Sequence, residues 1–298
     1  MNFTLAHLSD PHLAPLPAPH CSELINKRLT GYINWQQRRR FIHDADVLDK
    51  IVSDLKAQQP AHIAVTGDLA NIALPGEFAH GRQWLESLGS PHDVSLVPGN
   101  HDAYVRGGLA NAARAWGDYM LGDTGAGLPY LRRRGPLALI GLSTATPTAW
   151  GLATGRLGGT QLVALARMLA ALKDEGVFRV VLIHHPPVSK AKSHKLLGDA
   201  GPLLRVIAAH GTDLLLHGHD HVAMLNWLQG PGDTRVPAVG VPSASAAPSK
   251  TKNSAAYNLY TIDGSPDAWR CEMTARGINI SGEVVELKRM RLLPVPSI

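Results

Sequence analysis

The chain has 298 residues and a formal net charge of +5, with 45% hydrophobic and 18% charged residues. This composition is typical of a globular protein with enough apolar material for one large core or two modest ones. The net charge is too small to indicate nucleic-acid binding by itself, but it suits an anionic substrate. The two cysteines, Cys21 and Cys271, lack CxxC-type spacing, which argues against a thiolate metal site or a disulfide framework.

The chain begins with an apolar-rich run at residues 3–8, which we expect to form the first strand. This run does not follow the pattern of a signal peptide, because no basic region precedes a long apolar stretch. No window approaches the roughly 20 apolar residues that a membrane-spanning helix needs. We therefore expect a cytoplasmic protein, and contact with a membrane surface stays open.

Residues 13–43 are predicted to form an excursion from the body of the protein. Within it, residues 27–43 mix apolar side chains such as Tyr32, Trp35 and Phe41 with lysine and arginine. In one interpretation the aromatic side chains dock on the body and the arginines are solvated. In the other, this segment is a basic lip that contacts lipid headgroups or a polyanion.

Strands and helices alternate along the first half of the chain. Strands are expected at 63–66 and 94–97, and helices at 44–59, 76–88 and 109–120. The first of these helices has apolar residues at helical spacing, with Asp44 and Asp46 near its positively polarised start. The alternation implies right-handed crossovers and a largely parallel sheet.

The second half of the chain predicts a second set of elements. Strands are expected at 137–142, 180–183 and 213–216, and helices at 160–172 and 203–210. Thr160 is the expected N-cap of its helix, and Gly176 is the expected stop. Residues 236–298 are predicted to complete the second sheet with antiparallel strands near 257–262, 269–273 and 283–287. Residues 1–298 are therefore predicted to form a single domain.

Five of the predicted strands end in polar clusters rich in histidine. The clusters are Asp10-Pro11-His12, Gly67-Asp68, Gly99-Asn100-His101-Asp102, His184-His185 and His219-Asp220-His221. Each cluster alone could be a turn or a packed strand end. Ligands of open α/β sheets bind beyond the carboxyl ends of the strands, so the five clusters can converge on one site. Carboxylate, imidazole and amide groups suit Mn, Fe, Zn, Co or Mg in a water-accessible catalytic site.

The ordered set of these motifs, from Asp10 to His221, resembles the calcineurin-like metallophosphoesterase superfamily. The resemblance implies an α/β fold, a four-layer α-β-β-α sandwich of two mixed β-sheets, with the metal site at the C-terminal ends of the strands. It also implies two divalent metal ions. One ion would be bound by Asp10, His12, Asp68 and His221. The other would be bound by Asp68, Asn100, His184 and His219, with Asp68 bridging.

The chemistry of such a set suits phosphoester hydrolysis. Two ions roughly 3.5–4 Å apart can bind a hydroxide and hold both oxygens of an in-line phosphoryl displacement. His101 is the predicted catalytic residue, free to contact the phosphate and to protonate the leaving alkoxide. Asn100 and His185 are further predicted substrate contacts, and Asp102 is assigned no chemistry. Asn71 stands where many members of the superfamily carry an acidic residue, which weakens the expected support of His101 as an acid.

We therefore predict a metal-dependent phosphoric ester hydrolase, and a phosphodiesterase in preference to a monoesterase. The motif set resembles the bacterial cyclic-nucleotide and glycerophosphodiester branch by analogy. An alternative is hydrolysis of a lipid-linked phosphodiester or pyrophosphate, with peripheral membrane contact through residues 27–43. A nuclease is disfavoured because no extended basic face is visible. A non-catalytic scaffold is disfavoured because none of the predicted ligands has been lost.

Overall fold

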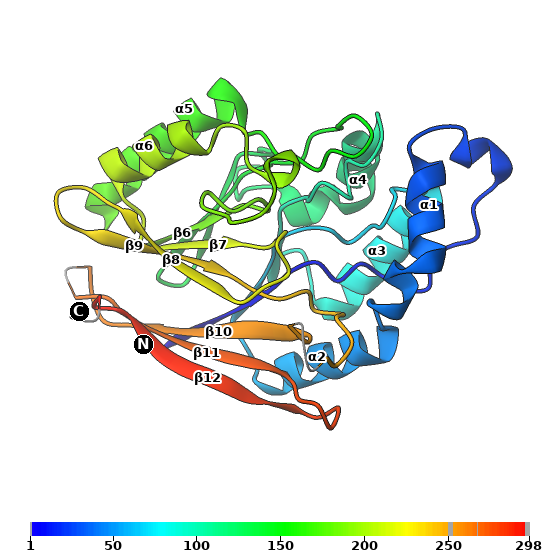
Figure 1. Ribbon diagram of the computed structural model, residues 1–298. Helices are drawn as coiled ribbons and strands as arrows, with labels where there is room; N and C mark the ends of the chain where they lie inside the picture. The colour runs from blue at the N-terminus through cyan, green and yellow to red at the C-terminus, as the bar shows by residue number, and fades with distance from the viewer. Residues whose placement is uncertain (1, 250–252, 267, 296–298) are drawn as a thin grey trace.

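Two six-stranded mixed β-sheets pack face to face at the centre of the protein, and helices cover their outer faces (Figure 1). The computed structural model describes residues 2–249, 253–266 and 268–295. A large core cluster combines buried residues of both sheets, such as Leu5 and Val180, with residues of the helices on the first sheet. The predicted fold class, a four-layer α/β sandwich with two mixed sheets, is confirmed.

The first sheet has the strand order β12-β11-β10-β1-β2-β3. Its strands are β1 (Phe3–Leu8), β2 (His62–Val65), β3 (Val94–Leu96), β10 (Ala256–Asp263), β11 (Arg270–Ile278) and β12 (Val284–Leu293). β1, β2 and β3 run parallel, as the strand–helix alternation predicts, and Leu5 of β1 lies opposite His62 of β2. Their carboxyl ends therefore point to one edge of the sheet.

The second sheet has the strand order β4-β5-β6-β7-β9-β8. Its strands are β4 (Tyr130–Arg134), β5 (Leu137–Gly141), β6 (Phe178–Leu182), β7 (Leu214–His217), β8 (Met224–Gln229) and β9 (Arg235–Gly240). β5, β6 and β7 run parallel, and β9 adds to β7 in the same direction. β4 and β8 pair antiparallel at the two edges.

The C-terminal strands correct one expectation. Residues 236–298 do not together complete the second sheet, because β9 belongs to that sheet whereas β10, β11 and β12 extend the first. β10 pairs antiparallel with β1, with Tyr260 opposite Leu5. Alternation along a strand identifies its buried face but not the sheet edge that it joins, so the sequence pattern left this choice undetermined.

The helices form the outer layers. They are α1 (Arg28–Gln37), α2 (Ala45–Ala57), α3 (Pro75–Leu88), α4 (Gly108–Trp116), α5 (Gly158–Leu172) and α6 (Ala200–His210). α2 contacts β10, β11 and β12, while α5 and α6 pack on the second sheet through a separate apolar cluster. In the described part of the chain, every helix is too short or too polar to cross a membrane.

The helix starts show local and long-range capping. Asp44, which was expected near the start of its helix, is the N-cap of α2, because its carboxylate accepts hydrogen bonds from the backbone N–H groups of Asp46 and Val47. The expectation for Thr160 is wrong, because α5 begins at Gly158. Its first N–H groups are satisfied by the carboxylate of Asp199, which lies 2.7 Å from Gly158 N. A cap supplied from a distant loop leaves no signal at the helix itself.

The excursion at 13–43 contains a helix, α1, that the sequence pattern did not predict. Trp35 is buried with 4% exposure, whereas Phe41 is 66% exposed, so only part of the aromatic set docks on the body. Arg28 donates to the carbonyl of Ala73 at 2.5 Å, and Lys27 donates to the Thr148 hydroxyl at 2.9 Å. The excursion is therefore tied to two loops of the body.

Candidate metal centre and active-site cleft

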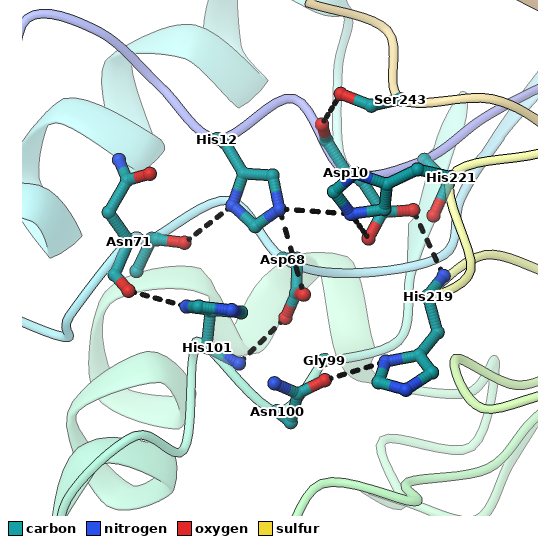
Figure 2. A network of polar contacts seen from close by, with 12 residues as sticks. Asp10, His12, Asp68, Asn71, Gly99, Asn100, His101, His219, His221 and Ser243 are labelled. Atoms are coloured by element: carbon teal, nitrogen blue, oxygen red, sulfur yellow. Dashed lines mark hydrogen bonds and ion pairs between the residues drawn. The ribbon is translucent and has the colours of Figure 1, made fainter. Parts of the chain in front are cut away.

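The loops that follow β1, β2 and β3 in the first sheet and β7 in the second converge at one place (Figure 2). The loop after β6 joins them through His184. One group of side chains places a ligand atom of each member within 4.8 Å of all the others. Its members are Asp10, His12, Asp68 and His221. This is the set that the resemblance implies for one metal ion.

The other predicted ligands adjoin this group. Asp68 Oδ2 lies 3.8 Å from His12 Nε2 and 3.3 Å from His184 Nε2, so the carboxylate stands between the two halves of the site. Asn100 Oδ1 lies 3.2 Å from His184 Nε2 and 2.9 Å from His219 Nδ1. The structure thus brings all seven predicted ligands together.

In three histidines, the ring nitrogen that points away from the ligand cluster is hydrogen-bonded to a backbone carbonyl. This contact defines the tautomer. His12 Nδ1 lies 3.2 Å from the carbonyl of Ala70, His184 Nδ1 2.6 Å from that of Thr66, and His219 Nε2 2.9 Å from that of Lys195. A ring nitrogen beside a carbonyl carries the proton, so the inner nitrogens of His12 and His219, whose pKa values burial lowers, are left with a lone pair.

Several ring nitrogens and side-chain oxygens that point into the cluster are therefore hydrogen-bond acceptors that lie opposite other acceptors. The lone pair of His219 Nδ1 faces Asn100 Oδ1 at 2.9 Å, with no proton available between them. Asp10 Oδ1 is buried, accepts no hydrogen bond and lies 3.2 Å from His221 Nε2. A cation among these atoms would satisfy the donor set, which consists of the hard and borderline ligands that divalent ions prefer. The residues present fit such ions.

Electrostatics support the same conclusion. Although burial alone lowers it, the Asp68 carboxylate raises the pKa of His184 to about 10. A position that holds a proton so tightly is one that attracts positive charge. Burial, and then the Arg39 charge, hold the pKa of His12 well below its ordinary value, which keeps this imidazole neutral and able to ligate.

The backbone at the ligands is unusual. Positive φ angles occur at five of the predicted ligands, namely Asp10 (52°), His12 (39°), Asp68 (58°), His219 (70°) and His221 (55°). This left-handed region costs a non-glycine residue roughly 1 kcal/mol or more, and such strain concentrates at functional sites. The motif glycines permit close approach, since a Cβ on Gly99 would lie 2.2 Å from Asp68 Oδ1 and one on Gly218 2.5 Å from Asp10 Oδ2.

His101 lies beside the ligands and is held by backbone. Its N–H donates to Asp68 Oδ1 at 2.7 Å, and its Nδ1 donates to the carbonyl of Asn71 at 2.5 Å. The amide side chain of Asn71 instead donates to the carbonyl of Leu13 at 2.9 Å. The contact that supports His101 thus comes from the main chain of Asn71 and not from its side chain.

Burial, followed by the charge of Arg39, lowers the pKa of His101 to about 3. Arg39 Nη1 lies 2.8 Å from His101 Nε2. Since Nδ1 carries the ring proton, Nε2 accepts this hydrogen bond and His101 is neutral.

Asp102 connects the loops that carry the ligands. Its carboxylate accepts three backbone hydrogen bonds, from Asp68 N at 2.9 Å, Ala70 N at 2.9 Å and Gly99 N at 2.8 Å. The side chain is fully buried. Asp102 therefore fixes the turn after β2 against the turn after β3, a role in orienting the loops and not in the chemistry.

His185 differs from its neighbour. Its side chain is fully buried, Nδ1 lies 2.8 Å from the Thr144 hydroxyl, and Nε2 lies 3.1 Å from the carbonyl of Ala153. Its ring packs against that of His219 with a centroid separation of 4.2 Å. The structure therefore places His185 behind a predicted ligand and away from the cleft wall, and we do not retain it as a substrate contact.

The ligand cluster opens into a cleft of about 970 Å³. Asp68, Asn100, His101, His219 and His221 line it. The excursion and the loop at 188–195 supply much of the remaining wall, including basic side chains. These are Lys27, Arg39, Lys190 and Lys195. Such a cleft is suited to an anionic ligand.

Two residues near the site were not identified from the sequence. The His43 ring lies 4.4 Å from the His12 ring, and Arg39 contacts both His43 and His101. Both residues belong to the C-terminal end of the excursion, outside every motif. The only signal was the arginine run at 38–40, in which nothing distinguishes the middle residue.

Comparison with known proteins agrees with the geometry. Residues 3–223 match the family model of the calcineurin-like phosphoesterases. The chain belongs to this family. Membership supports a metal-dependent phosphoester hydrolase, as the ordered motifs predicted.

Individual relatives of this calcineurin-like phosphoesterase are distant. A probable cyclic nucleotide phosphodiesterase of Synechococcus sp. is 28% identical over 228 residues, which cover 75% of this chain and 80% of that protein. A dimetal phosphatase from Danio rerio is similar with a TM-score of 0.60 and 15% identity, covering 96% of this chain and 98% of that one. A purple acid phosphatase from yellow lupin (Lupinus luteus) has a TM-score of 0.61 and 12% identity, covering 96% and 53%. The two structures show the shared fold.

Proposed function

We propose that this calcineurin-like phosphoesterase is a phosphodiesterase that uses two divalent metal ions. The observation that supports the proposal is the convergence of seven side chains of the types that bind metals. Some of their hydrogen-bond acceptors lie opposite one another. The proposed ligands are Asp10, His12, Asp68, Asn100, His184, His219 and His221. When bound, such ions would neutralise phosphoryl charge and lower the pKa of a water molecule towards ~7. The name of the Synechococcus relative supports a diester over a monoester substrate.

Asn100 and His101 are the proposed substrate contacts. Asn100 offers one uncharged oxygen at the meeting point of His184 and His219, so it adds no negative charge where a phosphate must approach. His101 lines the cleft at the next position along the chain and is held through Nδ1 by the carbonyl of Asn71. Its Nε2 is the atom able to meet a phosphoryl oxygen or the leaving alkoxide.

In the free protein His101 Nε2 accepts a hydrogen bond from Arg39, so it can meet a phosphoryl or alkoxide oxygen only when the ring is protonated. Leaving-group protonation by His101 needs this imidazolium, which burial and Arg39 disfavour in the free protein. The loss of rate when His101 is replaced should therefore be larger for a substrate whose leaving group needs a proton than for one whose leaving group does not. We expect His101→Asn to slow hydrolysis of alkyl diesters by about 10²- to 10⁴-fold, the range for general acid catalysis, and to slow bis(p-nitrophenyl) phosphate hydrolysis much less. Equal losses on both substrates would contradict the acid role.

The proposed activity is tested with purified protein loaded with Mn²⁺. We expect hydrolysis of bis(p-nitrophenyl) phosphate at a higher kcat/KM than p-nitrophenyl phosphate. Asn100→Ala should bind Mn²⁺ poorly and lose turnover. Asn111→Ala is the matched control, since among the described residues the Asn111 side chain hydrogen-bonds only to the exposed Arg114. Faster hydrolysis of the monoester would refute the diester preference, and no hydrolysis of either would refute the activity.

A lipid-linked phosphodiester or pyrophosphate is a second candidate substrate. The observation that favours it is the set of exposed apolar side chains on the excursion, where Ile25 is 82% and Phe41 66% exposed. Vesicles with anionic lipid should sediment wild-type protein more than the double variant Ile25→Ser, Phe41→Ser. Equal sedimentation of the two proteins would exclude this candidate.

A further inference from the structure

The excursion directs one arginine of its basic run into the cleft. Arg38 and Arg40 are exposed, whereas Arg39, at the start of a short 3-10 helix (Arg39–Phe41), is partly buried. Its Nη1 lies 2.8 Å from His101 Nε2, and its Nη2 lies 3.5 Å from His43 Nε2. The guanidinium therefore stands beside both the proposed catalytic histidine and the ligand cluster.

Arg39 forms no direct ion pair with any described residue, although the Asp68 carboxylate is near enough to favour its charge. In the described part of the chain no carboxylate oxygen lies within 4.0 Å of its guanidinium, and its two hydrogen-bond partners are imidazoles. Two other partly buried arginines are ion-paired: Arg276 lies 2.7 Å from Asp54, and Arg179 lies 3.3 Å from Asp213. The buried Arg132 is instead satisfied by backbone carbonyls, which Arg39 also lacks among the described residues. Removing a charge from water is costly unless an opposite charge compensates it. An anion in the cleft would compensate the charge of Arg39.

The fold holds Arg39 in this position before any ligand binds. Trp35, one turn earlier, is buried, and its ring is nearly parallel to that of His43 at an interplanar angle of 3°. Gly31 of α1 allows close packing, since a Cβ there would lie 2.6 Å from Ile72 Cγ2 on the loop after β2. The guanidinium is thus preorganised relative to the proposed metal ligands, which favours binding of a ligand that spans both.

The charges of the cleft wall define the kind of anion. Two carboxylates line the cleft among the described residues, and both are engaged: Asp68 at the ligand cluster and Asp220 with the Ser189 hydroxyl at 2.6 Å. The planar fork of an arginine matches two oxygens of a phosphate, and several of its N–H groups make no hydrogen bond in the described structure. A tetrahedral phosphoryl group between the ligand cluster and Arg39 fits this arrangement.

We propose that Arg39 is a substrate-binding residue that contacts a non-bridging oxygen of the reacting phosphoryl group. The excursion then supplies part of the active site and is more than a covering segment. This inference rests on the proposed function, because it assigns a contact within the same cleft.

The test combines binding and kinetics. Inorganic phosphate is titrated calorimetrically into Mn²⁺-loaded protein, and kcat and KM are measured on bis(p-nitrophenyl) phosphate. We expect Arg39→Ala to weaken phosphate binding and raise KM by about tenfold to a hundredfold, the range for a hydrogen bond to a charged group. Arg39→Lys should show a loss of phosphate affinity between those of wild type and Arg39→Ala, because lysine keeps the charge but lacks the planar guanidinium. Arg38→Ala, which removes the same charge from the adjacent exposed position, should stay within about twofold of wild type.

Two results would overturn the assignment. One is unchanged phosphate affinity and KM in Arg39→Ala. The other is a loss of kcat alone, which would mean that Arg39 only positions His101. If Arg39→Ala fails to fold by circular dichroism, Arg39→Gln and Arg39→Lys decide the same question. A wild-type protein that hydrolyses no phosphoester would refute the proposed function, while the phosphate titration would still report separately on Arg39.

Discussion

Asp102 is the residue whose replacement most directly tests how the site is held together. Its carboxylate accepts the N–H groups of Asp68, Ala70 and Gly99, two through Oδ2 and one through Oδ1. Replacement by asparagine keeps the size of the side chain and one oxygen. The amide oxygen can keep the two bonds made by Oδ2, but the amide NH₂ then faces the N–H of Ala70.

The expected cost follows from this count. One buried N–H loses its acceptor, which costs about 1–3 kcal/mol. Burial raises the pKa of Asp102 to about 7, so above that pH, where the carboxylate is charged, the two remaining bonds also lose the strength that a charged acceptor gives. We expect Asp102→Asn to lower the free energy of unfolding by about 2–4 kcal/mol. Asp102→Ala leaves all three N–H groups without an acceptor and should cost at least about 4 kcal/mol, a large part of a typical total stability of 5–15 kcal/mol.

Urea unfolding of the metal-free proteins measures this cost, and Mn²⁺ content measured on the same samples reports the effect on the site. The control is Asp118→Asn, since Asp118 is an exposed partner of Arg82 and should change stability by less than about 1 kcal/mol. A midpoint of Asp102→Asn equal to that of wild type would refute the reasoning.

Three further predictions test the site and the fold. Gly99→Ala should lower Mn²⁺ affinity and destabilise the protein by about 1–3 kcal/mol, because its Cβ would collide with Asp68; Gly117→Ala, where a Cβ meets no atom within 4 Å, should not. Burial raises the pKa of Asp54, but the Arg276 hydrogen bond outweighs burial and keeps it below its ordinary value. Asp54→Asn should therefore lose stability at pH 7, and its difference from wild type should shrink as the pH falls below ~4. Chelation of the bound metal ions should lower the Tm, because ions that bind only the folded protein stabilise it. An unchanged Tm would contradict this coupling of metal binding to folding.

The parts of the fold that could be predicted are those that local chemistry determines. Apolar strands followed by polar clusters identified β1, β2, β3, β6 and β7, and each cluster lies at the predicted strand end. The helix expected at 44–59 is α2, which begins one residue later, and Asp44 near its start is a local cap. In each case the signal and the structure involve neighbouring residues.

The parts that were missed depend on distant contacts. α1 contains glycine, threonine and isoleucine and has a weak apolar periodicity, so its helix depends on packing against the loop after β2. The cap of α5 comes from Asp199, about 40 residues away along the chain. The sheet that β10 joins is determined by its antiparallel pairing with the edge of β1.

The same distinction applies within the site. His184 and His185 are adjacent in sequence and chemically identical, yet only His184 faces Asp68. Arg39 is the middle residue of three arginines, and only the docking of α1 decides which of them faces His101. Residue type predicted the chemistry of the site, while side-chain direction required the packed structure.

The proposed ligands come from both sheets, which links the centre to the packing of the whole protein. Asp10 and Asp68 follow strands of the first sheet, whereas His184 and His221 follow strands of the second. Ligand distances across the centre therefore depend on how closely the two sheets approach each other. A substitution in the shared core, far from any ligand, should change ion affinity as well as stability, because binding and folding are thermodynamically coupled. Ion affinity is in this sense a measure of the fit between the two sheets.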